Sequence, residues 1–585
     1  MSNTSSTVQL VEFSRVFDET PTSLETYLTG ISRKMMLTAA SFLLGFYNRK
    51  SKFDSSRELL GMFFCAENND FANEVYQKLR AYEAEVQVPL KIINPFSALQ
   101  IFEYSFDHLT DEETQSKAES ERNIFKAILF QNEVNTANQL AAFDSTADMA
   151  IPCRIPYLSM AQSFPFSELI NYDKGEVLAS QIVKSIFLFE FLASHEKTQA
   201  LLMAFLDYFG CDSWRDYLKK VMPLVLSDIK NPTEAHTDIV VDPGDHFEDS
   251  CRFIEKLIIT SEDALEDYDF KKIRAKPFYK IEDGVYRIIF RLFNIEILYK
   301  GLYFKLSEIN DTLPKADKIK NLRSFYCDDF SERYLLYTIL ENIYHRRYIK
   351  FTGTEMKESL GNAEPDYYIR NGNTTFLFES KDILINAEVK ESFDFTKQEA
   401  EFKKKLYFEE KDGKVSKKAV LQLISNIEKC LKMEFPFDTN YKAKNQFIYP
   451  IVVLHDHMYK VPGLNYMVNE WHLSELQILR EKGLNIDRVQ PLTIIDIDTF
   501  IFHQDTLRNQ KIRLEDMIDK YHSYIHLDEK KKYASIEDAK QKLYNKSVSF
   551  STFLSNYLIE NGLYNPPKMI LEKGLSLFDE QENKS

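Results

Sequence analysis

Apolar residues recur at steps of three and four through the first 230 positions, which is the spacing of the buried face of a helix. We therefore predict a mostly helical N-terminal region, interrupted by strand-like pieces such as Val86 to Ile93. The clearest helical runs are Leu24 to Tyr47, Phe71 to Ala84, Ile182 to Ala193 and Thr198 to Phe209.

The pattern changes after residues 230–245, where prolines, a glycine and polar residues predict a linker. A helix is expected from Phe247 to Ile259. The next apolar runs predict β-structure, with Asp283-Gly284 as a hairpin turn. The expected strands are Phe278 to Ile281, Val285 to Leu292 and Ile295 to Leu306.

The stretch from Phe330 to Leu454 has the most regular pattern. It predicts an amphipathic helix capped by Ser331, then three strands, a second helix and a buried strand. Asn371-Gly372 predicts a tight turn between the second and third strands. The expected bounds are 330–345, 348–351, 366–369, 375–385, 417–433 and 447–454.

Beyond this stretch we expect a further strand at 492–502 and helices at 513–524 and 536–561. The predicted fold class is a multidomain α+β protein with a helical N-terminal region and a helical C-terminal tail. We divide the chain into four parts. Residues 1–245 form a helical domain that recognises a partner, substrate or signal, and residues 246–325 form a helix with a β-hairpin. Residues 326–505 form the α/β domain, and residues 506–585 form the helical end.

Charge and cysteine content narrow the classes of function. The 585 residues carry a formal net charge of −16, which argues against nonspecific coating of nucleic acid. Six scattered cysteines form no CxxC pair, which fits a reducing cytoplasm. The N-terminus lacks the pattern of a signal peptide, and the apolar run Met35 to Tyr47 is too short to span a bilayer. We expect a cytoplasmic protein with no membrane partner.

Acidic and basic residues converge within the regular stretch. Glu364-Pro365-Asp366 is followed by Glu379-Ser380-Lys381, and strand alternation places Glu379 and Lys381 on one face. The hairpin brings Asp366 toward them from the neighbouring strand. Two carboxylates suit Mg²⁺, which prefers oxygen ligands, and an ammonium beside them can orient a metal-activated water. The pattern predicts a hydrolytic centre.

These residues resemble the PD-(D/E)XK nuclease superfamily, which has the restriction-endonuclease-like fold with an α-β-β-β-α-β core. The resemblance covers residues 330–454, with an extension to about 505. It implies that Asp366 and Glu379 hold Mg²⁺ or Mn²⁺ and that Lys381 positions the attacking water. It further implies an acid from the first helix, for which Glu332 competes with Glu341, and a weakly matching glutamine, Gln422, on the second helix.

By the same resemblance the chain is similar to bacterial restriction and antiviral-defence nucleases. DNA is favoured over RNA as the substrate. The helical N-terminal region is the place to expect a protein partner or self-association. The rival hypothesis is an inactive, nuclease-like scaffold or interaction protein. The alternative for the motif itself is an exposed β-hairpin with a solvated cross-strand Glu/Lys pair.

Other motifs are weaker. A rival register pairs Glu388 with Lys390, which would need a longer strand through Asn386. The lysine-rich stretch 397–418 indicates a solvated helical face, with a path for a nucleic-acid backbone as the alternative. Similarly, 530–533 is interpreted as a charged surface turn. His455-Asp456-His457 does not have the spacing of a zinc site, and no phosphate-binding glycine loop is present in the sequence.

Overall fold

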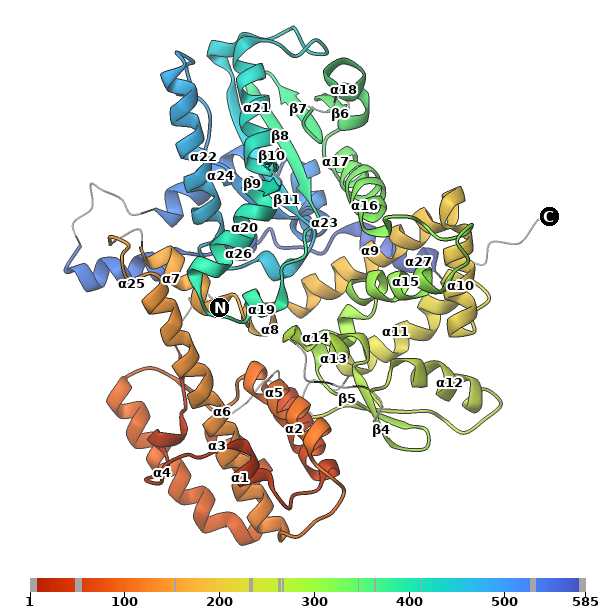
Figure 1. Cartoon of the computed structure of the whole chain (residues 1–585), viewed down its shortest axis with the longest axis vertical. Coiled ribbons are helices and arrows are strands. Elements are labelled where there is room, and N and C mark those ends of the chain that lie inside the picture. Colours follow the sequence, from red (N-terminus) through yellow and green to blue (C-terminus); the bar gives the residue numbers. More distant parts are fainter. Residues whose placement is uncertain are drawn as a thin grey trace. The chain divides into compact units, whose positions relative to one another are not determined.

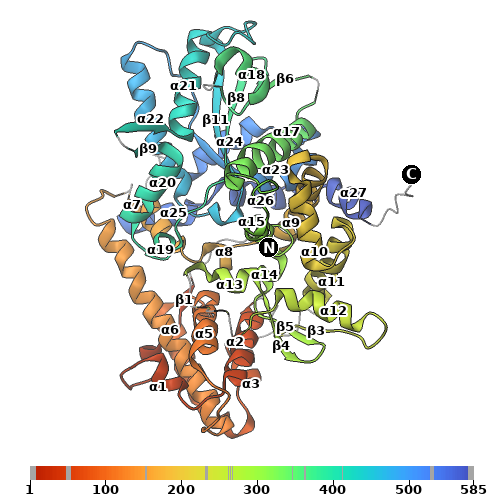
Figure 2. The same ribbon diagram turned by 45° about the vertical axis from the view of Figure 1, so that its right-hand side comes forward.

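The computed structural model describes residues 8–47, 55–151, 154–230 (backbone alone at 228–230), 235–260, 263, 265, 268–345, 347–361, 364–411, 413–526 and 533–577. The chain divides into two compact units (Figures 1 and 2). The sheet unit contains Ala141–Thr198 and the chain from Ile319 onward; the helical unit contains the chain up to Leu140 and Gln199–Lys318. The segment 1–245 that we expected to be one domain therefore contributes to both units.

The helical unit is built as the apolar spacing predicts, with small sheets at its margins. Its helices are α1 (Leu24–Leu28), α2 (Arg33–Tyr47), α3 (Ser55–Phe63), α4 (Asn69–Val86), α5 (Pro95–His108), most of α6 (Lys117–Ser145), α10 (Gln199–Phe209), α11 (Trp214–Lys230), α12 (Phe247–Ile254), α13 (Lys271–Ala275), α14 (Arg291–Glu296) and α15 (Lys300–Thr312). A parallel pair joins β1 (Gln9–Leu10) to β2 (Leu90–Lys91), and a three-stranded sheet has the order β3 (Asp238–Val240), β5 (Val285–Ile288), β4 (Phe278–Glu282).

Three predictions in this unit need correction. The prediction of a strand at 295–306 is wrong, because the segment forms the end of α14 and the first part of α15. In α15, the buried residues Leu302, Leu306 and Ile309 lie at helical spacing. Strand structure in 86–93 is confined to β2. The predicted linker 230–245 lies partly outside the described residues, and its later part forms β3, which pairs with β5. The β4–β5 hairpin is confirmed, with Gly284 at a φ of 77°.

The sheet unit has a five-stranded mixed sheet in the order β12-β11-β8-β7-β6. Neighbours β6, β7 and β8 are antiparallel, while β11 is parallel to both β8 and β12. Asn371 pairs with Thr374, so the predicted hairpin is confirmed with Gly372 and Asn373 in the turn. The strands are β6 (Ile349–Thr352), β7 (Tyr367–Asn371), β8 (Thr374–Lys381), β11 (Phe447–Leu454) and β12 (Thr493–Asp496), and a separate hairpin joins β9 (Phe408–Lys411) to β10 (Lys414–Lys417).

Helices cover both faces of the sheet (Figures 1 and 2). Leu377 of β8 belongs to an apolar core shared with α21 (Ala419–Lys432) and α22 (Leu464–Glu481). On the opposite face, the ring of Phe376 packs against Tyr344, just after α17 (Tyr337–Ile343), and Phe378 packs against Phe500 of α23 (Ile497–Arg508). Alternation along β8 therefore places its aromatic and its acidic side chains on opposite faces.

The helix that precedes the sheet begins earlier than expected. It runs through α16 (Leu322–Phe325), a π-helical segment η6 (Tyr326–Leu336) and α17. The prediction that Ser331 caps it is wrong, since Ser331 is buried inside the helix and donates a hydrogen bond to Asp382 Oδ2 (2.7 Å). A tertiary partner satisfies this hydroxyl, so the residue does not mark a helix terminus.

The remaining elements of the sheet unit are helices. The apolar run 492–502 is a strand only to Asp496, whose carboxylate caps α23 by accepting from the Thr499 N–H (3.0 Å). The helix expected at 536–561 is two helices, because Ser549 caps the second. The helices not yet given are α7 (Arg154–Ser163), α8 (Ser167–Ile170), α9 (Lys174–Ser194), α18 (Gly353–Leu360), α19 (Ala387–Lys390), α20 (Phe395–Phe402), η8 (Lys403–Tyr407), α24 (Leu514–Ile525), α25 (Ile536–Lys546), α26 (Phe550–Glu560) and α27 (Lys568–Ser576).

One helix of the described residues, α9, is long and apolar enough by length and composition to cross a membrane. In the fold, however, 72% of its apolar window is buried within the protein. The lysine in the middle of this helix, Lys184, is also buried and forms an ion pair with Asp498 (2.7 Å). This pattern is that of a core helix.

Candidate active site

The end of β8 brings together the three residues that the sequence analysis singled out. Lys381 Nζ lies 3.0 Å from Glu379 Oε2 and 3.4 Å from Asp366 Oδ2. Glu379 and Lys381 are two positions apart on one strand, so they lie on the same face. Asp366 immediately precedes β7, the antiparallel neighbour of β8. The expected convergence of two carboxylates and one ammonium is present.

Backbone hydrogen bonds fix the position of Asp366. The N–H of Ser380 donates to Asp366 Oδ2 (2.7 Å), and the N–H of Gly353 donates to the Asp366 carbonyl (2.8 Å). A Cβ at position 353 would lie 2.9 Å from the Tyr337 hydroxyl and 3.1 Å from that carbonyl, so this close approach favours glycine. The carboxylate is therefore held by main-chain groups, whatever the ionic state of its neighbours.

A third acid, Glu332, comes from the π-helical segment η6. Its Oε1 accepts a hydrogen bond from the Tyr337 hydroxyl (3.1 Å), which in turn accepts from the Gly353 N–H (3.1 Å). Burial, with the charge of Asp366 as the next cause, raises the pKa of Glu332 to about 8. Interaction with Asp366 and Lys381 places Glu332 within the electrostatic environment of the site.

The other two candidates lie outside this group. Glu341 contacts Lys350 and the Tyr367 hydroxyl instead. Gln422 sits half-buried on α21, and the structure records no contact between its side chain and Asp366, Glu379 or Lys381. Of the two acids that the resemblance left open on the first helix, the geometry therefore selects Glu332.

Glu379 is the most enclosed member of the site. Its side chain has no exposed surface, and its Oε1 has no hydrogen-bond partner among the described residues. Burial, followed by the charge of Asp366, raises the pKa of Glu379 well above its usual range. Burial opposes the charge on Lys381, but Asp366 and Glu379 outweigh it and raise the pKa of that amine. Solvent reaches the group through Lys381 and Asp366, whose side chains are 20% and 15% exposed.

Supporting residues that sequence reasoning missed lie directly behind the site. Asp382 accepts hydrogen bonds from Arg323 and from Ser331, and both donors lie on the helix that carries Glu332. Ser380 Oγ lies 2.8 Å from His455 Nε2. The only signal in the sequence was position, because Asp382 follows Lys381 and His455 follows the buried strand β11.

The rival strand register can now be decided. The register that pairs Glu388 with Lys390 is wrong, because both residues lie in the short helix α19 and β8 ends at Lys381 rather than at Ile385. Lys390 is buried and pairs with Glu168. His455 has its pKa lowered to about 4 by burial, so it is neutral at pH 7.

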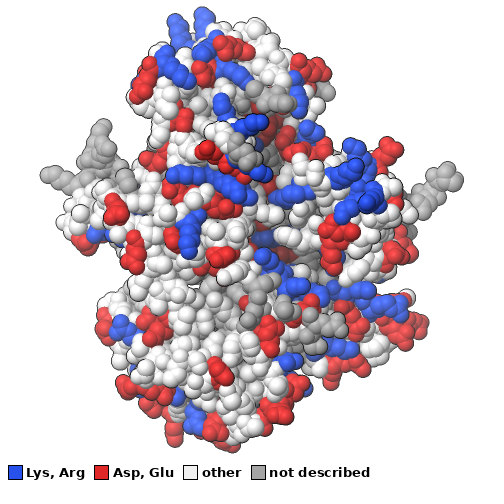
Figure 3. Space-filling model, viewed as in Figure 1, with Lys and Arg blue, Asp and Glu red and all other residues white. Residues whose placement is uncertain are grey.

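The lysine-rich stretch 397–418 is a mixed-charge surface. It forms α20, η8 and the hairpin of β9 and β10. Ion pairs join Lys403 to Glu399 and Lys418 to Glu409, each at 3.0 Å. Figure 3 shows basic and acidic side chains interspersed on the face in view. Such pairing favours a solvated surface. Residues 530–532 of the second basic motif lie outside the described residues.

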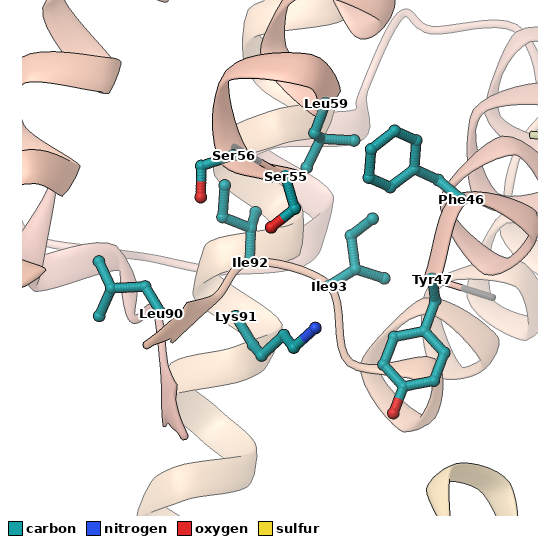
Figure 4. Close-up of a pocket in the computed structure, with 9 residues that line it drawn as sticks. All are labelled: Phe46, Tyr47, Ser55, Ser56, Leu59, Leu90, Lys91, Ile92 and Ile93. Atoms are coloured by element: carbon teal, nitrogen blue, oxygen red, sulfur yellow. The ribbon is translucent and has the colours of Figure 1, made fainter. Parts of the chain in front are cut away.

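A small cavity lies in the helical unit, between the end of α2, the start of α3 and β2 (Figure 4). Its volume is about 60 Å³, room for little more than water. Phe46, Leu59 and Ile93 form apolar walls, and the described residues that line it include no carboxylate or imidazole. It therefore does not offer the carboxylate oxygen ligands that a divalent cation needs.

Comparisons with family models, with curated proteins and with solved structures found no match to this chain. The chemical interpretation therefore rests on the geometry of the site alone.

Proposed function

We propose that the chain is a metal-dependent nuclease that hydrolyses phosphodiester bonds of nucleic acid, with DNA as the favoured substrate. One observation carries the proposal: the Lys381 ammonium contacts the carboxylates of Asp366 and Glu379, and Glu379, the most buried acid, has an oxygen without a hydrogen-bond partner among the described residues. A structural ion pair would not be expected to leave such a costly group unsatisfied.

The residues fit a hard divalent cation. When ionised, Glu332, Asp366 and Glu379 outnumber Lys381 by three charges to one. All three acids offer oxygen, the ligand type of Mg²⁺ and Mn²⁺. Asp366 and Glu379 would hold the ion, because Asp366 is fixed by main-chain bonds and Glu379 Oε1 lacks a partner. A bound cation would supply Lewis acidity and a more acidic water.

The chain's own groups would then perform distinct tasks. Lys381 Nζ, beside both carboxylates, would orient a water and stabilise charge that develops on the phosphate. The raised pKa of Glu332, about 8, favours the protonated carboxyl at pH 7, and its Oε1 accepts a hydrogen bond from the Tyr337 hydroxyl. The carboxyl can release this proton when a cation neutralises the site.

The fold supports the same proposal. A helix, the antiparallel strands β6, β7 and β8, helix α21 and the parallel strand β11 follow the order of the restriction-endonuclease-like core that we propose here. The chain departs from the minimal order by inserting α18 between β6 and β7, and α19, α20, η8 and the β9–β10 hairpin before α21. Glu332 also lies in π-helical turns, which occur often at functional sites.

Cleavage assays test the proposal directly. The full chain is incubated with plasmid, single-stranded DNA and RNA, in Mg²⁺ or in EDTA. We expect cleavage that needs Mg²⁺ and that Asp366→Ala and Lys381→Ala abolish. Glu341→Gln is the matched control, because this acid lies on the same helix but outside the site.

Equal cleavage by the wild type and both site variants would refute the assignment. No cleavage of any substrate, together with no thermal shift in Mg²⁺, would favour the inactive scaffold instead. The biological setting that the resemblance implies, bacterial antiviral defence, is tested by phage challenge. Cells that express the wild type should be protected, and cells that express Asp366→Ala should not.

A further inference from the structure

A groove of about 550 Å³ opens on the surface of the sheet unit, away from the acidic site residues. Its lining residues come from helices α24 and α26 and from the end of α25. Three aromatic side chains line it: Tyr524, Phe553 and Tyr557. Lys520 and Lys546 also line it, together with Asp519 and Ser523. Aromatic rings interleaved with lysines are the composition of surfaces that bind single-stranded nucleic acid.

The rings form a continuous series. The centroids of Tyr524 and Phe553 are 5.4 Å apart, and those of Phe553 and Tyr557 are 6.4 Å apart with nearly parallel planes (26°). Tyr524 is 38% exposed, so its ring is available to a ligand. A buried core would enclose these rings, whereas here they border open space.

The two lysines have no carboxylate partner within the described part of the chain. Lys520 Nζ donates to the Tyr557 hydroxyl (2.9 Å) and lies 4.6 Å from the centroid of that ring. Lys546 Nζ lies 5.3 Å from the centroid of Tyr524. The acid in the groove, Asp519, accepts a hydrogen bond from Tyr449 of β11, which holds its carboxylate toward the sheet. The cations are therefore free to meet an anionic ligand, in a protein whose net charge is −16.

We infer that this groove binds a single strand of nucleic acid, with bases stacked on the aromatic rings and phosphates on the lysines. A lysine over an exposed ring contributes only about two- to fivefold in affinity, whereas a stacked base contributes about 5- to 150-fold. A base can therefore displace each amine from its ring. The displaced amine stays at the ring edge, where the phosphate follows the base.

Two other occupants fit less well. A duplex keeps its bases stacked internally, so it would meet only the lysines. Lysine is depleted in protein–protein interfaces, which argues against a protein partner or a second copy of the chain. This inference deepens the proposed function by naming the form of the substrate, and it can be tested without cleavage.

Binding is measured by fluorescence anisotropy with the full chain in EDTA, using a labelled 12-nucleotide oligo-dT and a 12-base-pair duplex. We expect Tyr524→Ala and Tyr557→Ala each to weaken single-strand binding 5- to 150-fold while changing duplex binding less than twofold. Lys520→Gln combined with Lys546→Gln should lower the slope of log affinity against log salt by about 1.4. Tyr544→Ala is the matched control, since this exposed tyrosine lies on α25 outside the groove lining.

The outcomes separate this inference from the proposed function. Unchanged single-strand binding by both tyrosine variants and by the lysine pair overturns the inference, even if the chain cleaves DNA. A change of oligomeric state in the tyrosine variants, without loss of strand binding, overturns it in favour of a second copy. Loss of binding with intact melting temperature supports it, even if no cleavage is found.

Discussion

Replacing Glu332 with glutamine offers a sharp test of the site's electrostatics. The pKa of Glu332 is raised from about 4.5 in the unfolded chain to about 8 in the fold. Between these values the unfolded chain releases the proton and the folded chain keeps it, so stability falls as the pH rises. Glu332→Gln removes this titration and retains an acceptor for the Tyr337 hydroxyl. The variant should therefore be more stable than the wild type above pH 5.

The size of this gain in stability follows from the pH interval between the two pKa values of Glu332. Each pH unit within it costs the wild type about 1.4 kcal/mol, which gives a ceiling of about 3 kcal/mol at pH 7. The full window gives about 5 kcal/mol at higher pH. For a unit of this size, 1 kcal/mol corresponds to about 2 °C in melting temperature. We expect Glu332→Gln to melt on the order of 5 °C higher at pH 8 and unchanged at pH 4.5.

Differential scanning fluorimetry of the full chain in EDTA, at pH 4.5 and at pH 8, measures this difference. Glu341→Gln is the control: its carboxylate contacts Lys350 and Tyr367, and it should show no gain that grows with pH. If Glu332→Gln is less stable than the wild type at both pH values, Glu332 is an ordinary structural acid and our account of the site is wrong.

Four further outcomes follow from the structure. In the wild type, stabilisation by Mg²⁺ should grow between pH 6 and pH 8, because the cation must displace protons from the acids; a flat profile in thermal melts would contradict this. Glu379→Gln should abolish that stabilisation, which is about 2.7 kcal/mol at 100 times the dissociation constant, without lowering the melting temperature in EDTA. Arg370→Met should destabilise the sheet unit by about 3–5 kcal/mol in urea unfolding, because it leaves the buried carboxylate of Asp438 unpaired. Gly463→Ala should reduce the yield of folded protein, since the φ of Gly463 is 80° and a Cβ there would lie 2.0 Å from the Pro156 carbonyl oxygen. A normal melting temperature of Gly463→Ala would contradict this, because it would show that the backbone around Gly463 adjusts.

Several features of the site were predictable because they depend on local geometry. A strand has a side-chain period of two, so Glu379 and Lys381 had to share a face wherever that strand was placed. A two-residue turn after Asn371 sets the register of the hairpin, and that register brings Asp366 opposite the end of β8. Both facts can be read from a few adjacent residues.

Other features depended on contacts between distant segments. The apolar run 295–306 is compatible with a strand or a helix, and burial of Leu302, Leu306 and Ile309 against the rest of the unit selects the helix. Glu332 and Glu341 lie on the same helix, and nothing local distinguishes them. Asp382 accepts hydrogen bonds from Ser331 and Arg323 of that helix, 51 and 59 positions earlier in the chain, and these bonds help to determine which acid faces the site.

The sequence by itself therefore determined which side chains lie next to one another along and across the hairpin, since backbone periodicity and turn geometry act over a few residues. Only the tertiary structure decided which helix residue joins them, how deeply Glu379 is buried and where an aromatic groove opens between α24 and α26. These properties arise from packing between segments far apart in the chain, and local patterns in one sequence carry no record of that packing.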